Sequence, residues 1–331
     1  MGTNKDEGIQ IELFSPAELQ NLASQTEVRS FLPSAFITAA LPLRDIKRNS
    51  FVRKYNNIQL TLSSGASSVP FGVYGRLLLS ILTTHAVVDE QSDNGTVKIY
   101  YENLQHLLNE LKVEKQRGKK VLDQLELFSK STFIYEEKTE RNSTSDEFPQ
   151  ILEDVPVEKR QKVDVKIKNK TTGLMPFLNG FRFTEIEDNS GNKKNISFEI
   201  VLNERFVQLC QTHSVPIDYT VYSSIQSPLG KDLYAWIVYR NNILGDKPIF
   251  IPRQNLVNQF VPISSNVKDV KAMERNNYNL IKERIEEIKE KYYPGLNVVM
   301  EKDGSGMTLY KSAQIINPND QRYMLVTSTI K

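Results

Sequence analysis

A predicted helix over residues 267–292 carries cationic and amide side chains along one narrow stripe. At about 100° per residue, Lys268, Lys271, Arg275, Asn279 and Lys282 fall on one side of this helix. Lysine and arginine bind phosphates, while arginine and asparagine can pair at two points with guanine or adenine edges in a major groove. The stripe therefore favours a helix that reads DNA. The alternative is a solvated face of mixed charge.

The opposite side of the same helix is apolar, as packing against a core requires. It comprises Val267, Val270, Tyr278, Ile281, Ile285, Ile288 and Tyr292. Beyond Lys282 the outward side turns acidic at Glu286 and Glu290, so we expect any DNA contact to fade toward the C-terminal end.

A second cationic helix start is predicted within residues 115–131, where Arg117, Lys119 and Lys120 occupy the first turn. Recognition helices contact bases mainly from their N-terminal residues, which favours this placement. Asp123 and Leu127 take up the rest of the outward side. This helix is therefore expected either to contact phosphates rather than bases or to serve self-association.

The predicted elements around Arg117, Lys119 and Lys120 follow the order of a known DNA-binding unit. Apolar periodicity predicts a helix over 74–87, a strand over 95–101, helices over 102–111 and 115–131, and a strand over 132–138. Helix, strand, helix, helix, strand is the order of a winged helix, which is a helix-turn-helix unit with a small sheet.

A polar, charged and proline-containing stretch then interrupts the pattern at residues 139–176, and we predict a long flexible insertion there. Two alternating runs, 181–187 and 196–202, enclose "DNSGNKKN", whose residues suit a hairpin turn. This hairpin is expected to complete the first wing.

The same order returns in the second half of the chain. Helices are predicted over 203–213, 228–242 and 252–260, a short strand over 248–251, and a hairpin over 296–312 after the long helix. The predicted fold class is α+β, with two tandem winged-helix domains and small antiparallel wing sheets. The predicted domains are an N-terminal extension (1–29), a first domain (30–202) and a second domain (203–331).

One helix recurs in both halves, as "GVYGRLLLSILTTH" (72–85) and "SPLGKDLYAWIVYR" (227–240). Placing Gly75 on Gly230 sets Arg76 on Lys231. The match indicates two copies of one module, and the alternative is coincidence between two amphipathic helices.

Composition narrows the function classes. The chain has 331 residues, a formal net charge of +2, one cysteine and three histidines. No phosphate-cradling loop occurs, the histidines lie at no metal-ligand spacing, and His85 is expected to be a packed or capping residue. We therefore expect no catalysis, no cofactor and no metal. The chain has no long apolar segment and no secretory signal, so we expect a cytoplasmic protein without a membrane partner.

Basic residues are concentrated rather than spread. They crowd into residues 43–55, 112–120, 158–170 and 267–275. The small net charge does not by itself indicate an anionic partner, and the distribution of the basic residues is more informative. Each cluster taken alone is more often a solvated face.

Three stretches resemble the plasmid-encoded RepA replication initiators. They are residues 40–62, 69–87 and 215–240, the last followed by "PIFIPRQNLVNQF". The resemblance implies tandem winged helices that bind repeated double-stranded sites at a plasmid origin, help to open the adjacent duplex and recruit the host replicative helicase. It also implies homodimers that repress their own gene. A winged-helix transcription repressor and a protein-interaction module remain the alternatives.

Overall fold

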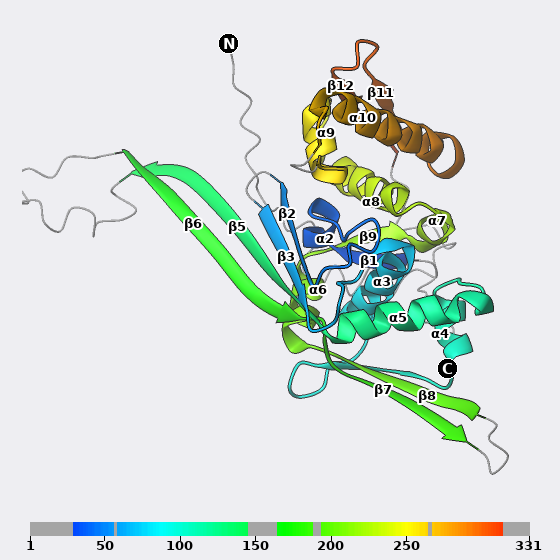
Figure 1. Ribbon diagram of the computed structural model, residues 1–331. Helices are drawn as coiled ribbons and strands as arrows, with labels where there is room; N and C mark the ends of the chain where they lie inside the picture. Colours follow the sequence, from blue (N-terminus) through cyan, green and yellow to red (C-terminus); the bar gives the residue numbers. More distant parts are fainter. Residues whose placement is uncertain (1–28, 56–57, 145–163, 188–192, 264–266, 314–331) are drawn as a thin grey trace, which may run out of the picture.

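The computed structural model describes residues 29–55, 58–144, 164–187, 193–263 and 267–313. Two units with the same order of helices and strands lie toward opposite ends of the molecule (Figure 1). Residues 15–25, where Ser15 at a cap and Pro16 in the first turn predict a short helix, fall outside the described residues.

The second unit is a winged helix. Ser227 caps its first helix by accepting a hydrogen bond from the Gly230 N–H, and Pro228 occupies the first turn. Its strands form an antiparallel sheet in the order β10-β12-β11. The elements are α8 (Pro228–Ile243), β10 (Ile249–Pro252), α9 (Arg253–Phe260), α10 (Val270–Glu287), a π-helical turn (Ile288–Tyr292), β11 (Val298–Met300) and β12 (Gly306–Leu309).

The first unit repeats this arrangement. Its sheet has the order β4-β8-β7, in which the hairpin strands and the short strand take the same relative places as in the second unit. The elements are α3 (Gly72–Val88), β4 (Val97–Tyr101), α4 (Leu104–Glu110), a 3-10 turn (Lys115–Arg117), α5 (Gly118–Ser129), β7 (Leu178–Glu187) and β8 (Lys193–Leu202). The predicted class, two tandem winged-helix units in an α+β chain, is confirmed, as is the wing hairpin.

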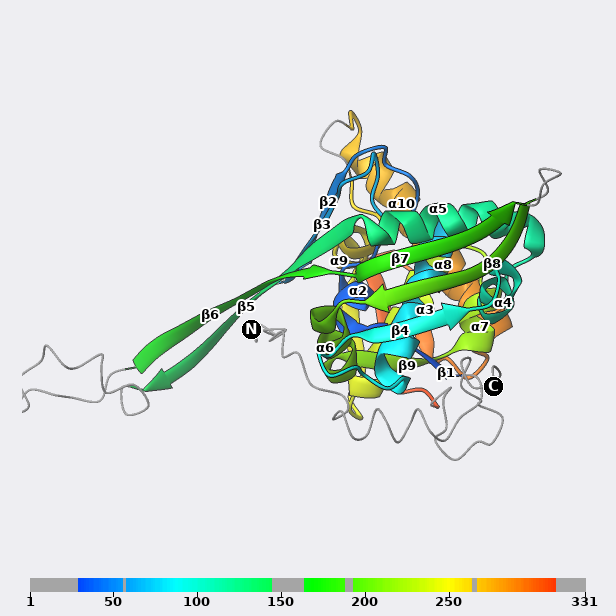
Figure 2. The ribbon, with the colours of Figure 1, turned by 90° about the horizontal axis from the view of Figure 1, so that it is seen from below.

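The stretch predicted as a flexible insertion contains regular structure. Strands β5 (Ser131–Thr144) and β6 (Asp164–Pro176) pair antiparallel along their whole length, so the prediction is wrong for residues 139–144 and 164–176. Residues 145–163 lie outside the described part. The charged and proline-containing composition of this stretch hid the strands from pattern reading. The hairpin extends away from the body in Figures 1 and 2.

Strand β5 does not belong to the winged-helix sheet. It joins a separate four-stranded sheet of order β2-β3-β5-β6, with β2 (Ser50–Tyr55) and β3 (Ile58–Ser64). The strand predicted over 132–138 is therefore present, but it belongs to this separate sheet and not to the wing. Its neighbour β3 matches the alternation of Ile58, Leu60 and Leu62, which predicts a strand over 57–64.

A two-stranded sheet ties distant parts of the chain together. Strand β1 (Arg29–Pro33), which leads into the short helix α2 (Ser34–Thr38), pairs antiparallel with β9 (Ser214–Asp218). Next to it, α6 (Glu204–Thr212) places the Phe206 ring 5.5 Å from that of Phe177 and 6.3 Å from that of Phe133. Residues 203–218, predicted to open the second domain, thus pack on the first unit. The boundary at residue 203 stays a prediction.

The recurring helices α3 and α8 pack in the core. Their aligned glycines, Gly75 and Gly230, both face a side chain that leaves little room for a Cβ. A Cβ on Gly75 would lie 3.0 Å from the Gln124 Oε1 atom, and one on Gly230 would lie 2.9 Å from the Ile225 Cγ2 atom. An added Cβ would therefore crowd the Gln124 amide at Gly75 and would force the Ile225 side chain to shift at Gly230.

The aligned cations Arg76 and Lys231 are both buried and meet near one carboxylate. Arg76 donates through Nε and Nη2 to the two carboxylate oxygens of Asp232, at 2.6 Å each. The Lys231 ammonium donates to the Tyr222 carbonyl, and its nitrogen lies 4.5 Å from the centre of the Tyr222 ring. Burial, together with repulsion from Arg76, lowers the pKa of Lys231 to about 7. The repeated helix thus supplies a buried polar link between the two units.

Candidate nucleic-acid interface

Helix α10 begins at Val270, three residues later than predicted. The Asp269 side chain caps it by accepting a hydrogen bond from the Ala272 N–H at 2.9 Å. Tyr278, Ile281 and Ile285 are buried, as predicted. Because packing of α10 on the core starts only at the third turn, Val270 is 53% exposed, and its predicted inward position is wrong.

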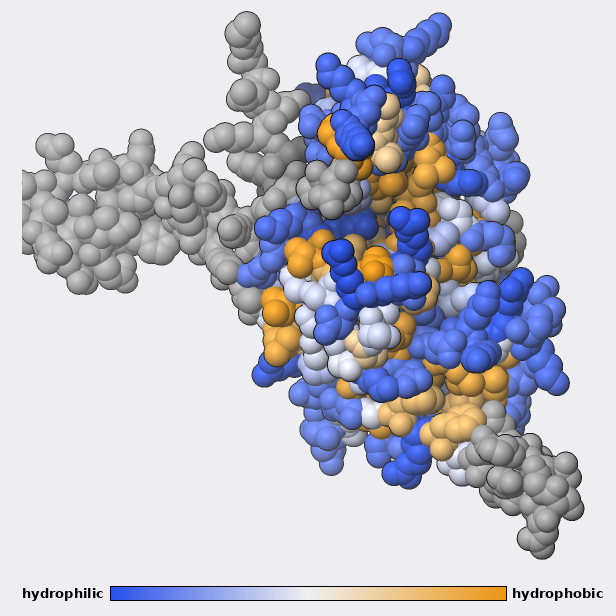
Figure 3. Space-filling model, viewed as in Figure 1, coloured by the Kyte–Doolittle hydropathy of each residue, from blue (hydrophilic) through white to orange (hydrophobic). Residues whose placement is uncertain are grey.

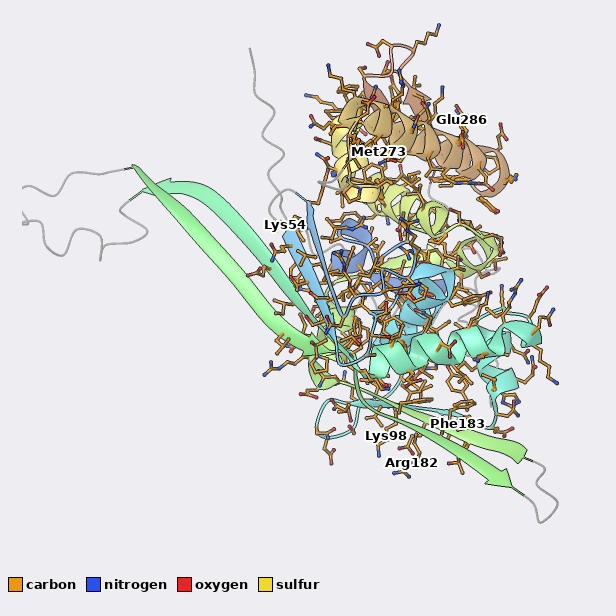
Figure 4. The ribbon with its side chains drawn as sticks, viewed as in Figure 1. Lys54, Lys98, Arg182, Phe183, Met273 and Glu286 are labelled. Atoms are coloured by element: carbon orange, nitrogen blue, oxygen red, sulfur yellow. The ribbon has the colours of Figure 1, made fainter. Side chains whose placement is uncertain are left out.

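All five candidate residues of this helix region lie on the exposed surface. Lys268 precedes the helix, and the others follow along its length, namely Lys271, Arg275, Asn279 and Lys282. The Lys282 ammonium lies 3.8 Å from the Glu286 carboxylate, which dilutes the positive charge toward the C-terminal end. Figure 4 labels Met273 near the start of α10 and Glu286 farther along it. That these side chains contact DNA remains a prediction.

A hollow of about 750 Å³ opens where α9, α10 and the β11–β12 turn meet. Lys271 and Arg275 line it from α10, and Arg253 lines it from the start of α9. The Arg253 Nε atom lies 2.9 Å from the Glu274 carboxylate, which holds this guanidinium in place. Sequence analysis did not single out Arg253, whose only signal was a cation directly after Pro252 at a helix start.

The turn between the wing strands is acidic at the edge of this hollow. Hydrogen bonds from Ser305 lower the pKa of the Asp303 carboxyl, which therefore stays ionised at neutral pH. A carboxylate repels phosphate. The Asp303 side of this turn is thus a poor phosphate contact, and the cations near the start of α10 are the better ones.

The second candidate set lies at the start of α5. Arg117, Lys119 and Lys120 are exposed there. Gly118 between them is buried against Leu104, whose Cδ2 atom would lie 3.0 Å from an added Cβ. This close approach of α4 and α5 leaves the three cations outside the packed surface.

The views of Figures 1 and 2 agree on where the two helices lie. Helix α10 is near one end of the molecule and α5 is nearer the other, with α8 and α3 between them (Figure 1). The start of α10 and the length of α5 lie toward the upper side of the molecule in Figure 2.

The ionisable cluster around His85 is structural. His85 Nδ1 lies 2.6 Å from the Asp89 carboxylate, and Nε2 lies 3.0 Å from the Glu110 carboxylate. Burial lowers the pKa of His85, but Glu110 and Asp89 outweigh it and raise the pKa to about 10. The side chain is packed, as predicted, and its ring is held on both sides by core groups.

Other chemical features are sparse in the part of the chain that the structure describes. Cys210 is buried, and burial raises the pKa of its thiol, so it is a poor nucleophile. Within the described ranges no group of three His, Cys, Asp or Glu side chains is placed to hold a metal ion. Among the same residues no helix combines the length and the apolar character needed to cross a membrane.

Comparison with known proteins gave structural neighbours only. No protein-family model and no curated protein matches the chain. A selenomethionine crystal structure of domains 2 and 3 of RctB is 13% identical, with a TM-score of 0.45 over 84% of this chain and 98% of the other. A second structure of the same RctB domains is 12% identical, with a TM-score of 0.42 over 83% and 94%. The Pi initiator protein in complex with iteron DNA is 13% identical, with a TM-score of 0.41 over 86% and 95%. All three TM-scores lie below 0.5, and the two winged-helix units are assigned from this chain's own helices and strands.

Proposed function

We propose that this chain is a non-enzymatic replication initiator that binds double-stranded plasmid origin DNA sequence-specifically. The observation that carries the proposal is that each winged-helix unit presents exposed cations at the start of its third helix. That position is where winged helices and their helix-turn-helix relatives meet a major groove. The resemblance of three sequence stretches to plasmid initiators selects replication from the several uses of such a fold.

In the proposed complex α10 enters a major groove. Arg275 and Asn279 pair with base edges, while Lys268, Lys271 and Lys282 contact phosphates. The start of α5, with Arg117, Lys119 and Lys120, contacts a second segment of the same duplex. Opening of the adjacent duplex, recruitment of the host helicase and repression by a homodimer belong to the proposal through the resemblance alone.

The test is binding of the purified chain to duplexes from the DNA flanking its own gene, against random duplex, over a salt series. Arg275→Ala or Asn279→Ala should cost about 1–3 kcal/mol and relax sequence preference. Lys268→Ala should weaken binding to all duplexes alike and lower the salt slope by roughly one unit. Lys98→Ala is the control, because Lys98 is exposed on β4, far from α10 in Figure 4.

The outcomes separate the alternatives. Selective, salt-dependent binding without support for replication of a plasmid carrying the cognate origin would indicate a transcription repressor. Equally weak binding to every duplex at low salt would contradict the proposal and favour a protein-interaction module. Unchanged binding by all three of these variants would show that α10 is not the reading element.

A further inference from the structure

A basic surface outside both winged-helix units lies at the joint between them. Four cations on the segment leading into β2, and on β2 itself, are exposed. We call them the basic seam: Arg44, Lys47, Arg48 and Lys54. Strand β2 lies between the unit with α10 and the unit with α5 in Figure 1, and Figure 4 labels Lys54 on it. Lys54 therefore lies at the joint between the two units that carry the candidate reading helices.

The buried side chain of Arg53, next to Lys54 on β2, anchors the seam to the second unit. Arg53 is buried and donates through Nη1 to the carbonyls of Gln259, at 2.7 Å, and Phe260, at 3.2 Å. These carbonyls end α9, where the helix dipole favours a cation. Burial lowers the pKa of Arg53 to about 10, so it stays charged at neutral pH. Since side chains alternate along a strand, burial of Arg53 directs Lys54 outward.

The chain before β2 forms a hollow whose lining suits an anion. This hollow of about 590 Å³ is lined by Lys47, Arg48, Asn49, Ser50, Ala66 and Ser67, none of which carries a carboxylate. The nearby Asp45 carboxylate accepts hydrogen bonds from the Lys47 N–H, at 2.8 Å, and the Ser68 hydroxyl, at 2.7 Å. Lysine, arginine, serine and asparagine are among the usual donors to phosphate oxygens.

We propose that the basic seam binds backbone phosphates of the duplex between the segments contacted by α10 and α5. This inference rests on the proposed function and adds to it a third contact that reads no bases. Arg53 fixes the seam to α9 of the second unit, and β2 is linked through β3 to β5, the strand that follows α5 of the first unit. Phosphates held at the seam therefore set the distance along the duplex between the two reading helices.

The distance between the two reading helices limits how far apart their two sites can lie in the DNA. If both helices enter major grooves on the same side of the duplex, their sites lie a whole number of helical turns apart, roughly 10 base pairs or a multiple of that. Without the seam, the protein would bind the two sites with looser phasing.

The test is a charge-removing pair, Lys47→Asn with Arg48→Gln, in the full chain. Lys47 has a φ of 50°, a conformation that asparagine tolerates, so the pair should fold. We expect the salt slope to fall by roughly two units for origin and random duplex alike, with sequence preference unchanged. Hydroxyl-radical footprinting should lose protection between the two protected segments.

The matched control removes the same charge elsewhere. Lys98→Gln with Arg182→Gln changes two exposed cations on the first unit's sheet, which lies at the other end of the molecule from α10 (Figure 4). This pair should leave the slope and the footprint as they are. If the first pair fails to fold, Arg44→Gln with Lys54→Gln tests the same surface.

Each outcome has a clear meaning. A slope and a footprint that the seam variants leave unchanged, while the α10 variants lose binding, would overturn this inference and leave the proposed function standing. Absence of any salt-dependent duplex binding by the unaltered chain would overturn both. Figure 3 shows hydrophilic side chains interspersed with apolar ones over the middle of this face.

Discussion

Removing the carboxylate of Asp232 should destabilise the joint between the two units. Arg76 and Asp232 are almost fully buried, and two charge-assisted hydrogen bonds of 2.6 Å join them. Arg76 would keep its bonds to the carbonyls of Leu41 and Pro42, but its charge would have no counterion. Asp232 also offsets part of the burial cost of Arg53. Breaking a buried pair from one side costs about 3–5 kcal/mol, and we expect Asp232→Ala to fall in that range.

The assay is urea unfolding followed by tryptophan fluorescence. Trp236 is the only tryptophan in the chain and is buried in α8, so it reports on the unit that contains Asp232. Asp246→Ala, which removes an exposed carboxylate from the loop after α8, should change the free energy of unfolding by less than about 0.5 kcal/mol. Arg76→Met combined with Asp232→Leu should recover much of the loss, because apolar replacement of a buried pair is often neutral. A loss below about 1 kcal/mol for Asp232→Ala would refute the reasoning, since it would mean that water reaches Arg76.

Three further predictions concern the two units separately. Trp236→Ala should cost about 3–5 kcal/mol in urea unfolding, because this ring packs edge-on against Phe260 at 5.3 Å; a cost near zero would contradict its place in the core. The folded-state pKa of His85, about 10, lies above its unfolded value, so its contribution to stability is complete below about pH 6.5 and is lost as pH rises to about 10. His85→Gln should therefore destabilise more at pH 6 than at pH 10, and comparing variant with parent at each pH cancels other titrating groups. Gly306→Ala should disrupt the second wing, seen as a lowered melting temperature, because a Cβ there would lie 2.2 Å from the Ile251 carbonyl oxygen; an unchanged melting temperature would show that the two strands are not so closely paired.

The winged-helix units could be predicted because their signals are local. The buried side of α10, with Tyr278, Ile281 and Ile285, follows from a helical period, and the turn "DNSGNKKN" marks the first wing hairpin. Val270 was placed wrongly because periodicity alone does not say how far along a helix its neighbours extend. The candidate cations of α10 and α5 were correctly predicted to be exposed.

The remaining structure depends on contacts between distant residues. Strand β1 is buried at every position, so it shows no alternation, and its pairing with β9 joins residues far apart in the chain. The bond between Arg76 and Asp232 could not be predicted either, since a cation early in an amphipathic helix is usually solvated. Alignment of Arg76 with Lys231 indicated a shared position, but not that both are buried at one joint.

The pairing of β1 with β9 constrains how the chain can be made. During synthesis the N-terminal part emerges first, at roughly 5–20 residues per second. Strand β1 has no strand to pair with until residues 214–218 have left the ribosome. Phe206, which packs on Phe177, is made only a few residues before β9. This two-stranded sheet therefore cannot form while the polypeptide is shorter than about two thirds of its length. Fragments that end before β9 should be recovered as targets of chaperones and proteases rather than as folded half-molecules.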